Sequence, residues 1–441
     1  MASDTETGTD TGAVPVHISR TRFAPSDDLR RLTAGRPVIR IDGNGNDNDS
    51  DSDNNHDNNH DNNHANADDN ADDNADADPR AGSRPVWLVT GYHEVRQVLG
   101  DHTGFSTRRR FTTPGTPDGN DDWRPDEAVG QLMDYDPPEH TRLRKMLTAE
   151  FTHRRTRRLE PRIEALVGER LDAMEHAGPP ADLVRHFADP LPGLVLCELI
   201  GVPRDDRADF LRRCHTHLAT SGRLHRAAAG TAFTRYLAAL ITRTRKDPDD
   251  GFLGMLVRDH GDDFTDKELR GVCVLLMLAG LDNISGMLGL GTLALLEHPD
   301  QLERLRADPA ATDRAVDELL RHLSVPHAPT PRTALEDVTV GDQLVRAGDT
   351  VVCSIPMANR DPALTTDPDR LDLAREPVAH VAFGHGIHHC LGAALARLEL
   401  RIAFTALLHR FPRLSLGIPA DQVPFRVLST AYGVRRLPVT W

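Results

Sequence analysis

The longest apolar pattern in the chain covers residues 265–297 and predicts one very long helix. It opens with Thr265-Asp-Lys-Glu268, a capping box in which the threonine side chain accepts from the Glu268 amide while the glutamate reaches back. Apolar residues then recur up to Glu297, and Pro299 stops the helix two residues later. At 1.5 Å per residue the helix would be about 50 Å long, enough to cross a whole domain.

A membrane span is the alternative interpretation of this helix, because Val272–Leu281 is almost wholly apolar. Asp282 and Asn283 lie at its centre, however, and a charged side chain in the middle of a bilayer is costly. No basic flank follows the apolar run. We therefore expect a buried core helix.

Shorter patterns predict the remaining elements. Leu391, Leu395, Leu398 and Ile402 recur at the spacing of one buried helix face. We expect helices at 94–100, 136–151, 159–176, 191–200 and 391–409, and strands at 36–41, 85–90, 331–340 and 344–356.

Composition changes this picture at two places. The formal net charge is −15, but 13 Asp and no Lys or Arg lie between Asp42 and Asp78, and removing these charges from −15 leaves −2. The folded part is thus nearly neutral, which gives no indication of nucleic-acid binding. We expect a disordered insert at about 42–79, with three Asp-Asn-Asn-His tetrads at 53–64, and a disordered tail at 1–14. Loose binding of divalent metal by the tetrads is the less favoured interpretation.

The cysteines and the N-terminus indicate the compartment. The chain has five Cys, an odd and scattered set that argues against a disulfide framework and for a reducing cytoplasm. The first residues are acidic and polar, so we expect neither a signal peptide nor a membrane anchor.

The clearest candidate chemistry lies at 383–392, which reads Phe-Gly-His-Gly-Ile-His-His-Cys-Leu-Gly. Cys390 comes just before the last long helix, where free N–H groups and the helix dipole favour a thiolate that can ligate a metal. Gly384 and Gly386 allow the loop to fold tightly. A zinc site built from the neighbouring histidines is the alternative, although their spacing does not make them converge on one point.

This stretch resembles the haem-binding signature of the cytochromes P450, Phe-x-x-Gly-x-x-x-Cys-x-Gly, filled here by Phe383, Gly386, Cys390 and Gly392. The resemblance implies haem b with Cys390 as axial ligand of the iron. It also implies the P450 fold, mainly α with small β-sheets (α+β), as a single haem-organised domain at 15–441 that the insert interrupts.

Other motifs match the same family in order and separation. His140 and Arg144, four residues apart, Arg332 and His388 match propionate-binding positions, and a guanidinium suits a carboxylate. Glu318 and Arg321 match its structural ion pair. Ala279-Gly280-Leu-Asp282-Asn283 resembles the oxygen-binding motif, in which Gly280 would leave room beside the haem and Asp282 matches the acid.

Asn283 stands where the family has threonine. An amide donates and accepts hydrogen bonds but does not readily relay protons, unlike a hydroxyl. Protons could instead arrive by ordered water from Asp282 or from a substrate hydroxyl. The departure therefore leaves the proton route open.

The resemblance implies a haem-thiolate monooxygenase that inserts oxygen from O₂ into a C–H or C=C bond of a mid-sized, mainly apolar molecule such as a polyketide or terpenoid intermediate. Because Asn283 replaces threonine, radical coupling, ring formation or peroxide-driven oxidation is the alternative, and a zinc-binding structural protein is a remote one. The pocket would be lined by residues within 105–129, 212–229, 272–283, 324–330 and 429–432.

Electrons would come from a separate ferredoxin and an NAD(P)H-dependent ferredoxin reductase, because no flavin or iron–sulfur segment is fused here. Arg142, Lys145 and Arg397 are candidate contacts for an acidic ferredoxin, with an ordinary solvated surface as the alternative.

Overall fold

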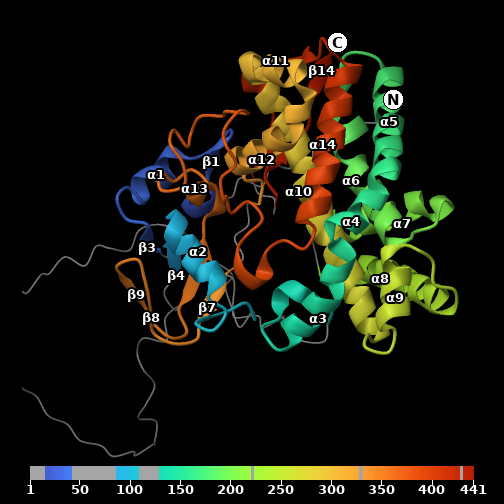
Figure 1. Cartoon of the computed structure of the whole chain (residues 1–441), viewed down its shortest axis with the longest axis horizontal. Helices are drawn as coiled ribbons and strands as arrows, with labels where there is room; N and C mark the ends of the chain where they lie inside the picture. Colours follow the sequence, from blue (N-terminus) through green and yellow to red (C-terminus); the bar gives the residue numbers. More distant parts are fainter. Residues whose placement is uncertain (1–14, 42–85, 109–128, 220–222, 327–330, 428–430) are drawn as a thin grey trace, which may run out of the picture.

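The computed structural model describes residues 15–41, 86–108, 129–219, 223–326, 331–427 and 431–441. The predicted tail at 1–14 and the predicted insert at about 42–79 lie outside these residues. Figure 1 shows most helices gathered on one side of the molecule, and the larger sheet with helices α1 (Asp27–Leu32), α2 (Tyr92–Gly100) and α13 (Ile355–Ala358) on the other.

Helices form most of the described chain. They are α1 (Asp27–Leu32), α2 (Tyr92–Gly100), α3 (Glu139–Thr148), α4 (His153–Thr156), α5 (Glu160–Ala177), α6 (Pro190–Ile200), α7 (Arg207–Ala219), α8 (Arg223–Lys246), α9 (Phe252–His260), α10 (Asp266–Glu297), α11 (Pro299–Ala307), α12 (Thr312–Leu323), α13 (Ile355–Ala358) and α14 (Ala393–Arg410).

The strands are short and form small sheets. The five-stranded sheet has the order β3 (Val38–Ile41), β4 (Val86–Val89), β10 (Thr350–Cys353), β7 (Arg332–Ala334) and β5 (Phe105–Ser106). A second sheet holds β11 (Ser415–Leu416), β14 (Pro438–Thr440) and β6 (Ala181–Asp182). Three strand pairs complete the set: β1 (Arg20–Thr21) with β2 (Ala24–Pro25), β8 (Val338–Val340) with β9 (Gln343–Val345), and β12 (Phe425–Arg426) with β13 (Gly433–Val434).

The two strands on either side of the insert pair as predicted. β3 runs antiparallel to β4, with Val38 opposite Val89 and Ile41 opposite Val86. The predicted strand at 331–340 is instead two strands, β7 and β8, because the chain leaves the sheet after Ala334 and re-pairs with β9. The helix expected at 136–151 likewise ends at Thr148 and continues as a 3₁₀ turn, Ala149–Phe151.

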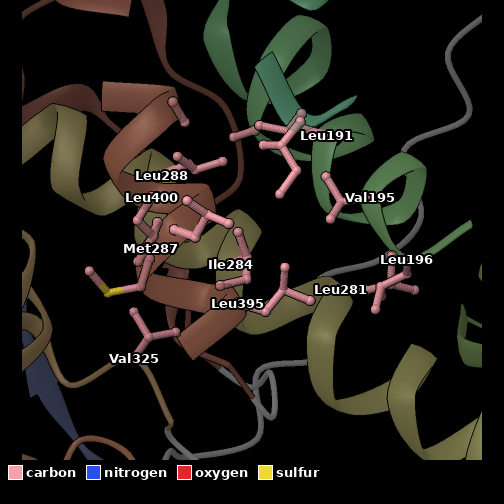
Figure 2. Close-up of a cluster of buried hydrophobic side chains, with 14 of the residues drawn as sticks. Leu191, Val195, Leu196, Leu281, Ile284, Met287, Leu288, Val325, Leu395 and Leu400 are labelled. Carbon is pink, nitrogen blue, oxygen red and sulfur yellow. The ribbon is translucent and has the colours of Figure 1, made fainter. Parts of the chain in front are cut away.

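Helix α10 is the centre of the core. Its capping box forms as predicted, since the Glu268 amide donates to the Thr265 hydroxyl at 3.2 Å and the Thr265 amide donates to the Glu268 carboxylate at 2.9 Å. Figure 2 shows side chains of α6, α10 and α14 packed into one apolar cluster. Among the described residues α10 is the one helix long and apolar enough to cross a membrane, but 61% of its apolar window is buried inside the fold. That burial is typical of a core helix.

Candidate active site

The loop that precedes α14 is folded tightly around Cys390. The Cys390 amide donates to the Phe383 carbonyl at 2.8 Å, and the His389 amide donates to the Gly386 carbonyl at 3.1 Å. Gly384 and Gly386 have φ values of 73° and 71°, the left-handed region that glycine adopts without penalty. The two glycines thus serve the tight fold that the sequence predicts.

Cys390 differs from the other four cysteines. Those four are buried, and Cys390 alone has an exposed surface. Its thiol is nevertheless closely surrounded by protein, and this burial raises the pKa of Cys390, while the Gly392 amide, Arg144 and Arg397 act in the opposite direction. In the protein without its cofactor, burial thus acts against the thiolate, while the Gly392 amide and the two guanidinium groups act in its favour. A coordinated metal ion would have to deprotonate the thiol.

Phe383 is held from behind by a charged group. The Arg397 guanidinium lies 4.6 Å from the centre of the Phe383 ring and donates to the Asp317 carboxylate at 2.7 Å. His380 also contacts Asp317, at 3.7 Å. These contacts fix the aromatic residue of the signature and place a cation near Cys390.

His140 on α3 and His388 in the loop come together from distant parts of the chain. Their ring centres are 4.3 Å apart. Burial lowers the pKa of both, that of His388 to about 3 with Arg332 contributing, so both rings are neutral at pH 7. The Nε2 atom of each ring is buried without a hydrogen-bond partner among the described residues.

These groups fit an anionic ligand with carboxylates. A buried imidazole nitrogen without a partner is costly, and a carboxylate would satisfy it. Arg144 makes no ion pair with any carboxylate of the described chain, and burial lowers its pKa and that of Arg332. The donor set predicted for two propionates is thus gathered at one place.

The middle of α10 carries an open face, a short stretch of exposed residues on an otherwise buried helix. Leu278 is 38% exposed and Ala279 is exposed as well, although most of the helix around them is buried. Asn283, one turn later and partly exposed, donates through its side-chain nitrogen to the Ala279 carbonyl at 2.8 Å. Asn283 and Ala279 therefore share this open face.

Gly280 and Asp282 face other neighbours. A Cβ atom on Gly280 would come within 2.9 Å of the Leu196 side chain on α6, so the glycine allows close packing of two helices. The role we expected for it, room beside the cofactor, is not what this contact shows. Asp282 lies near α7, where it helps burial raise the pKa of Cys214 to about 12.

The ion pair between Glu318 and Arg321 is fully buried. The Arg321 Nε and Nη2 atoms donate to the Glu318 carboxylate at 2.7 and 2.8 Å. Arg375 also donates to Glu318, at 3.1 Å, and Arg321 reaches the carbonyl of Asn359 at 2.8 Å. Sequence analysis missed Arg375, and no local pattern marks it, because it lies 57 residues from Glu318.

The expected ferredoxin contacts are unequal. Arg142 pairs with Glu268, and Arg397 pairs with Asp317. Lys145 is exposed and has no ion pair within the described part of the chain. It is the residue of the three that stays available to a partner.

The zinc alternative finds no support in this geometry. Among the described residues no three or more His, Cys, Asp or Glu side chains come together in a way that could hold a metal ion. His388 packs against His140 with the two rings tilted, and His380 contacts Asp317, so these histidines do not converge on Cys390.

Comparison with known proteins identifies the family. The cytochrome P450 family model matches residues 223–416. Cytochrome P450 165B3 from Amycolatopsis orientalis is 58% identical over 356 residues, which is 80% of this chain and 89% of that protein. Cytochrome P450 165C4 from the same organism is 52% identical over 357 residues, which is 81% of this chain and 87% of that protein.

Solved structures agree on the fold. StaH, a P450 from biosynthesis of the glycopeptide antibiotic A47934, superposes with a TM-score of 0.82 and 56% identity, over 97% of this chain and 100% of that one. OxyB in complex with the X-domain from teicoplanin biosynthesis gives 0.81 and 56%, over the same shares. OxyC, implicated in oxidative C–C coupling in vancomycin biosynthesis, gives 0.81 and 46%, over 96% of each chain. The predicted mainly α fold with small sheets is confirmed, and the chain belongs to the cytochrome P450 family of monooxygenases, whose haem iron is ligated by a cysteine thiolate.

Proposed function

We propose that Cys390 is the thiolate ligand of haem in this chain, and that the enzyme couples aromatic side chains of a peptide in the biosynthesis of a glycopeptide-type antibiotic. The observation that carries the coupling proposal is Asn283 on the open face of α10, where the family's hydroxyl would stand. The kinship supports it, because OxyC is implicated in an oxidative coupling and StaH serves glycopeptide biosynthesis.

Named residues would hold the cofactor. His140, Arg144, Arg332 and His388 would bind the propionates, and Phe383, Gly384 and Gly392 would shape the loop that presents Cys390. Haem bound here would supply activation of O₂ with two electrons from a ferredoxin. Cys390 would hold the iron as a thiolate, the form in which cysteine ligates metals.

Coupling and oxygen insertion differ in their balance. In coupling, two hydrogen atoms leave two aryl groups, a C–C or C–O bond forms between them, and O₂ with two electrons and two protons leaves as two waters. In insertion, one oxygen atom of O₂ stays in the product. In the coupling reaction the substrate itself gives up hydrogen, so a relay hydroxyl on α10 is less needed, and an amide such as Asn283 is compatible with it.

Oxygen insertion into a mid-sized, mainly apolar molecule is the second candidate. It is supported by relatives of lower identity, such as nocardicin C N-oxygenase from Nocardia uniformis and pentalenic acid synthase from Streptomyces avermitilis, each 42% identical. Parts of four of the five segments expected to line the pocket lie outside the described residues, at 109–128, 220–222, 327–330 and 429–430. The similarity to OxyC, which is implicated in an oxidative C–C coupling and is 46% identical to this chain, makes coupling the preferred candidate.

Partners follow from the same proposal. We propose a ferredoxin, reduced by an NAD(P)H-dependent ferredoxin reductase, that docks near Lys145, in the cytoplasm and without nucleic acid or membrane. The solved complex of OxyB with an X-domain makes an X-domain a further partner to test.

The test uses the haem-loaded enzyme with ferredoxin, reductase, NADPH and O₂, with and without the X-domain of the teicoplanin system. The substrate is a synthetic linear peptide that carries several phenol side chains. Coupling predicts a product lighter by two hydrogen atoms, with no label from ¹⁸O₂. A product heavier by one labelled oxygen atom would favour the second candidate, and loss of activity in Cys390→Ser is required by both.

A further inference from the structure

We infer that Asn283 selects the substrate: its side-chain oxygen accepts a hydrogen bond from a phenol hydroxyl of the peptide. This inference rests on the proposed coupling function and deepens it, because it names the group on the substrate that the site recognises. It assigns Asn283 to binding and orientation and not to proton delivery.

The orientation of the Asn283 amide is fixed by its own helix. The atom that lies 2.8 Å from the Ala279 carbonyl oxygen must be the nitrogen, since two acceptors would repel at that distance. The nitrogen is therefore turned back along the helix, in the bond that small polar side chains make to the preceding turn. The amide oxygen, on the other branch of the side chain, has no hydrogen bond to any described residue and is free to accept.

The surroundings make this oxygen the recognition group of the open face. Leu278 and Ala279 are apolar and exposed, whereas Gly280 contacts Leu196 and Asp282 lies near Cys214 on α7. Within the described stretch 278–283, Asn283 is thus the polar side chain that shares the open face with Ala279. A single acceptor among apolar groups fits a ligand that is aromatic with one hydroxyl donor.

The chemistry gives discrimination in one direction. A phenol hydroxyl donates a hydrogen bond to the amide oxygen. An aryl ring without the hydroxyl would displace water from that oxygen and leave it without a hydrogen bond. A threonine here would use its hydroxyl proton on the Ala279 carbonyl and hold its acceptor closer to the helix. Asparagine carries the acceptor farther into the open face, which is the physical difference between the two residues.

The test compares three linear peptides that differ at one ring: tyrosine, phenylalanine and 4-fluorophenylalanine. Dissociation constants are measured with the haem-loaded enzyme from the Soret shift and, independently, by calorimetry, with X-domain present. We expect the tyrosine peptide to bind about fivefold tighter than the other two, the factor for one hydrogen bond. Asn283→Leu and Asn283→Ala should abolish this preference, and Asn283→Thr should restore part of it.

Ser285→Ala is the matched control, because Ser285 lies on the same helix but is buried and donates to Asp189, away from the open face. It should keep the wild-type preference. Equal binding of the three peptides to wild-type enzyme, or an unchanged preference in both Asn283→Leu and Asn283→Ala, would overturn the inference while leaving coupling intact. If none of the peptides binds and none is converted, the proposed function itself fails.

Discussion

Replacing Gly386 by alanine tests how the cysteine loop is held. Gly386 has φ = 71°, and a Cβ atom there would lie 2.4 Å from the Leu99 carbonyl oxygen and 2.8 Å from the Gly100 Cα atom of α2. Both are backbone atoms, so the clash cannot be relieved by rotating a side chain. Ordinary contact between carbon and oxygen needs about 3.3 Å, so the loop and α2 must separate by about 1 Å.

Gly384 is the matched control for this substitution. Its φ is 73°, but the nearest atom to an added Cβ is the His388 carbonyl oxygen at 3.9 Å, an ordinary contact. Gly384→Ala should therefore cost only the left-handed backbone, about 1–2 kcal/mol. Gly386→Ala should add the cost of overpacking, about 1–3 kcal/mol, for a total of about 2–5 kcal/mol.

Urea unfolding followed by tryptophan fluorescence gives the two free energies of unfolding, and haem content per chain reports the loop. We expect Gly386→Ala to lose more stability and more haem than Gly384→Ala. If the two variants behave alike, the close approach of α2 to the loop does not constrain it, and the account of Gly386 fails.

Three further predictions test other parts of the structure. Burial raises the pKa of Glu399 to about 8, well above its unfolded value, so the free energy of unfolding should fall by about 1.4 kcal/mol per pH unit between the two values. Urea unfolding at a series of pH values should show this decline in wild type and not in Glu399→Gln. Equal slopes of unfolding free energy against pH in the two proteins would contradict it. Arg321→Ala should destabilise the fold by about 3–5 kcal/mol, because it leaves the buried Glu318 carboxylate with one partner fewer. Arg314 lies on the same helix but is half exposed, so Arg314→Ala should cost under about 1 kcal/mol. Comparable losses of unfolding free energy in the two variants would show that burial of the pair is not what makes it matter. Lys145→Glu should slow reduction by ferredoxin at low salt in stopped-flow measurements. A Lys145 variant reduced at the wild-type rate would end the docking proposal.

Local patterns predicted those features whose cause is local. The capping box and the two glycines before Cys390 depend on neighbours within a few residues, and the structure has them as expected. The strands on either side of the insert are each marked by their own apolar residues, although they pair across it. The sequence analysis took 331–340 as one strand, although the alternation of apolar and polar residues breaks at Leu335-Glu336-Asp337, between β7 and β8.

Tertiary causes could not be read from the chain. The pKa of Cys390 depends on how deeply the loop is packed, which no helix-dipole argument contains. Gly280 leaves room for the side chain of Leu196 on another helix, and Arg142 forms an ion pair with Glu268. Candidate residues were thus identified by motif, while their partners came from the fold.

The measurement that tests the central claim most directly is the spectrum of the reduced, carbon monoxide-treated protein, with Cys390→Ser beside wild type. Wild-type protein, freshly purified and haem-loaded, should show the red-shifted band of a thiolate-ligated haem, and Cys390→Ser should lack it while Cys353→Ser keeps it. A wild-type protein without that band, or a Cys390→Ser variant that retains it, would contradict the account.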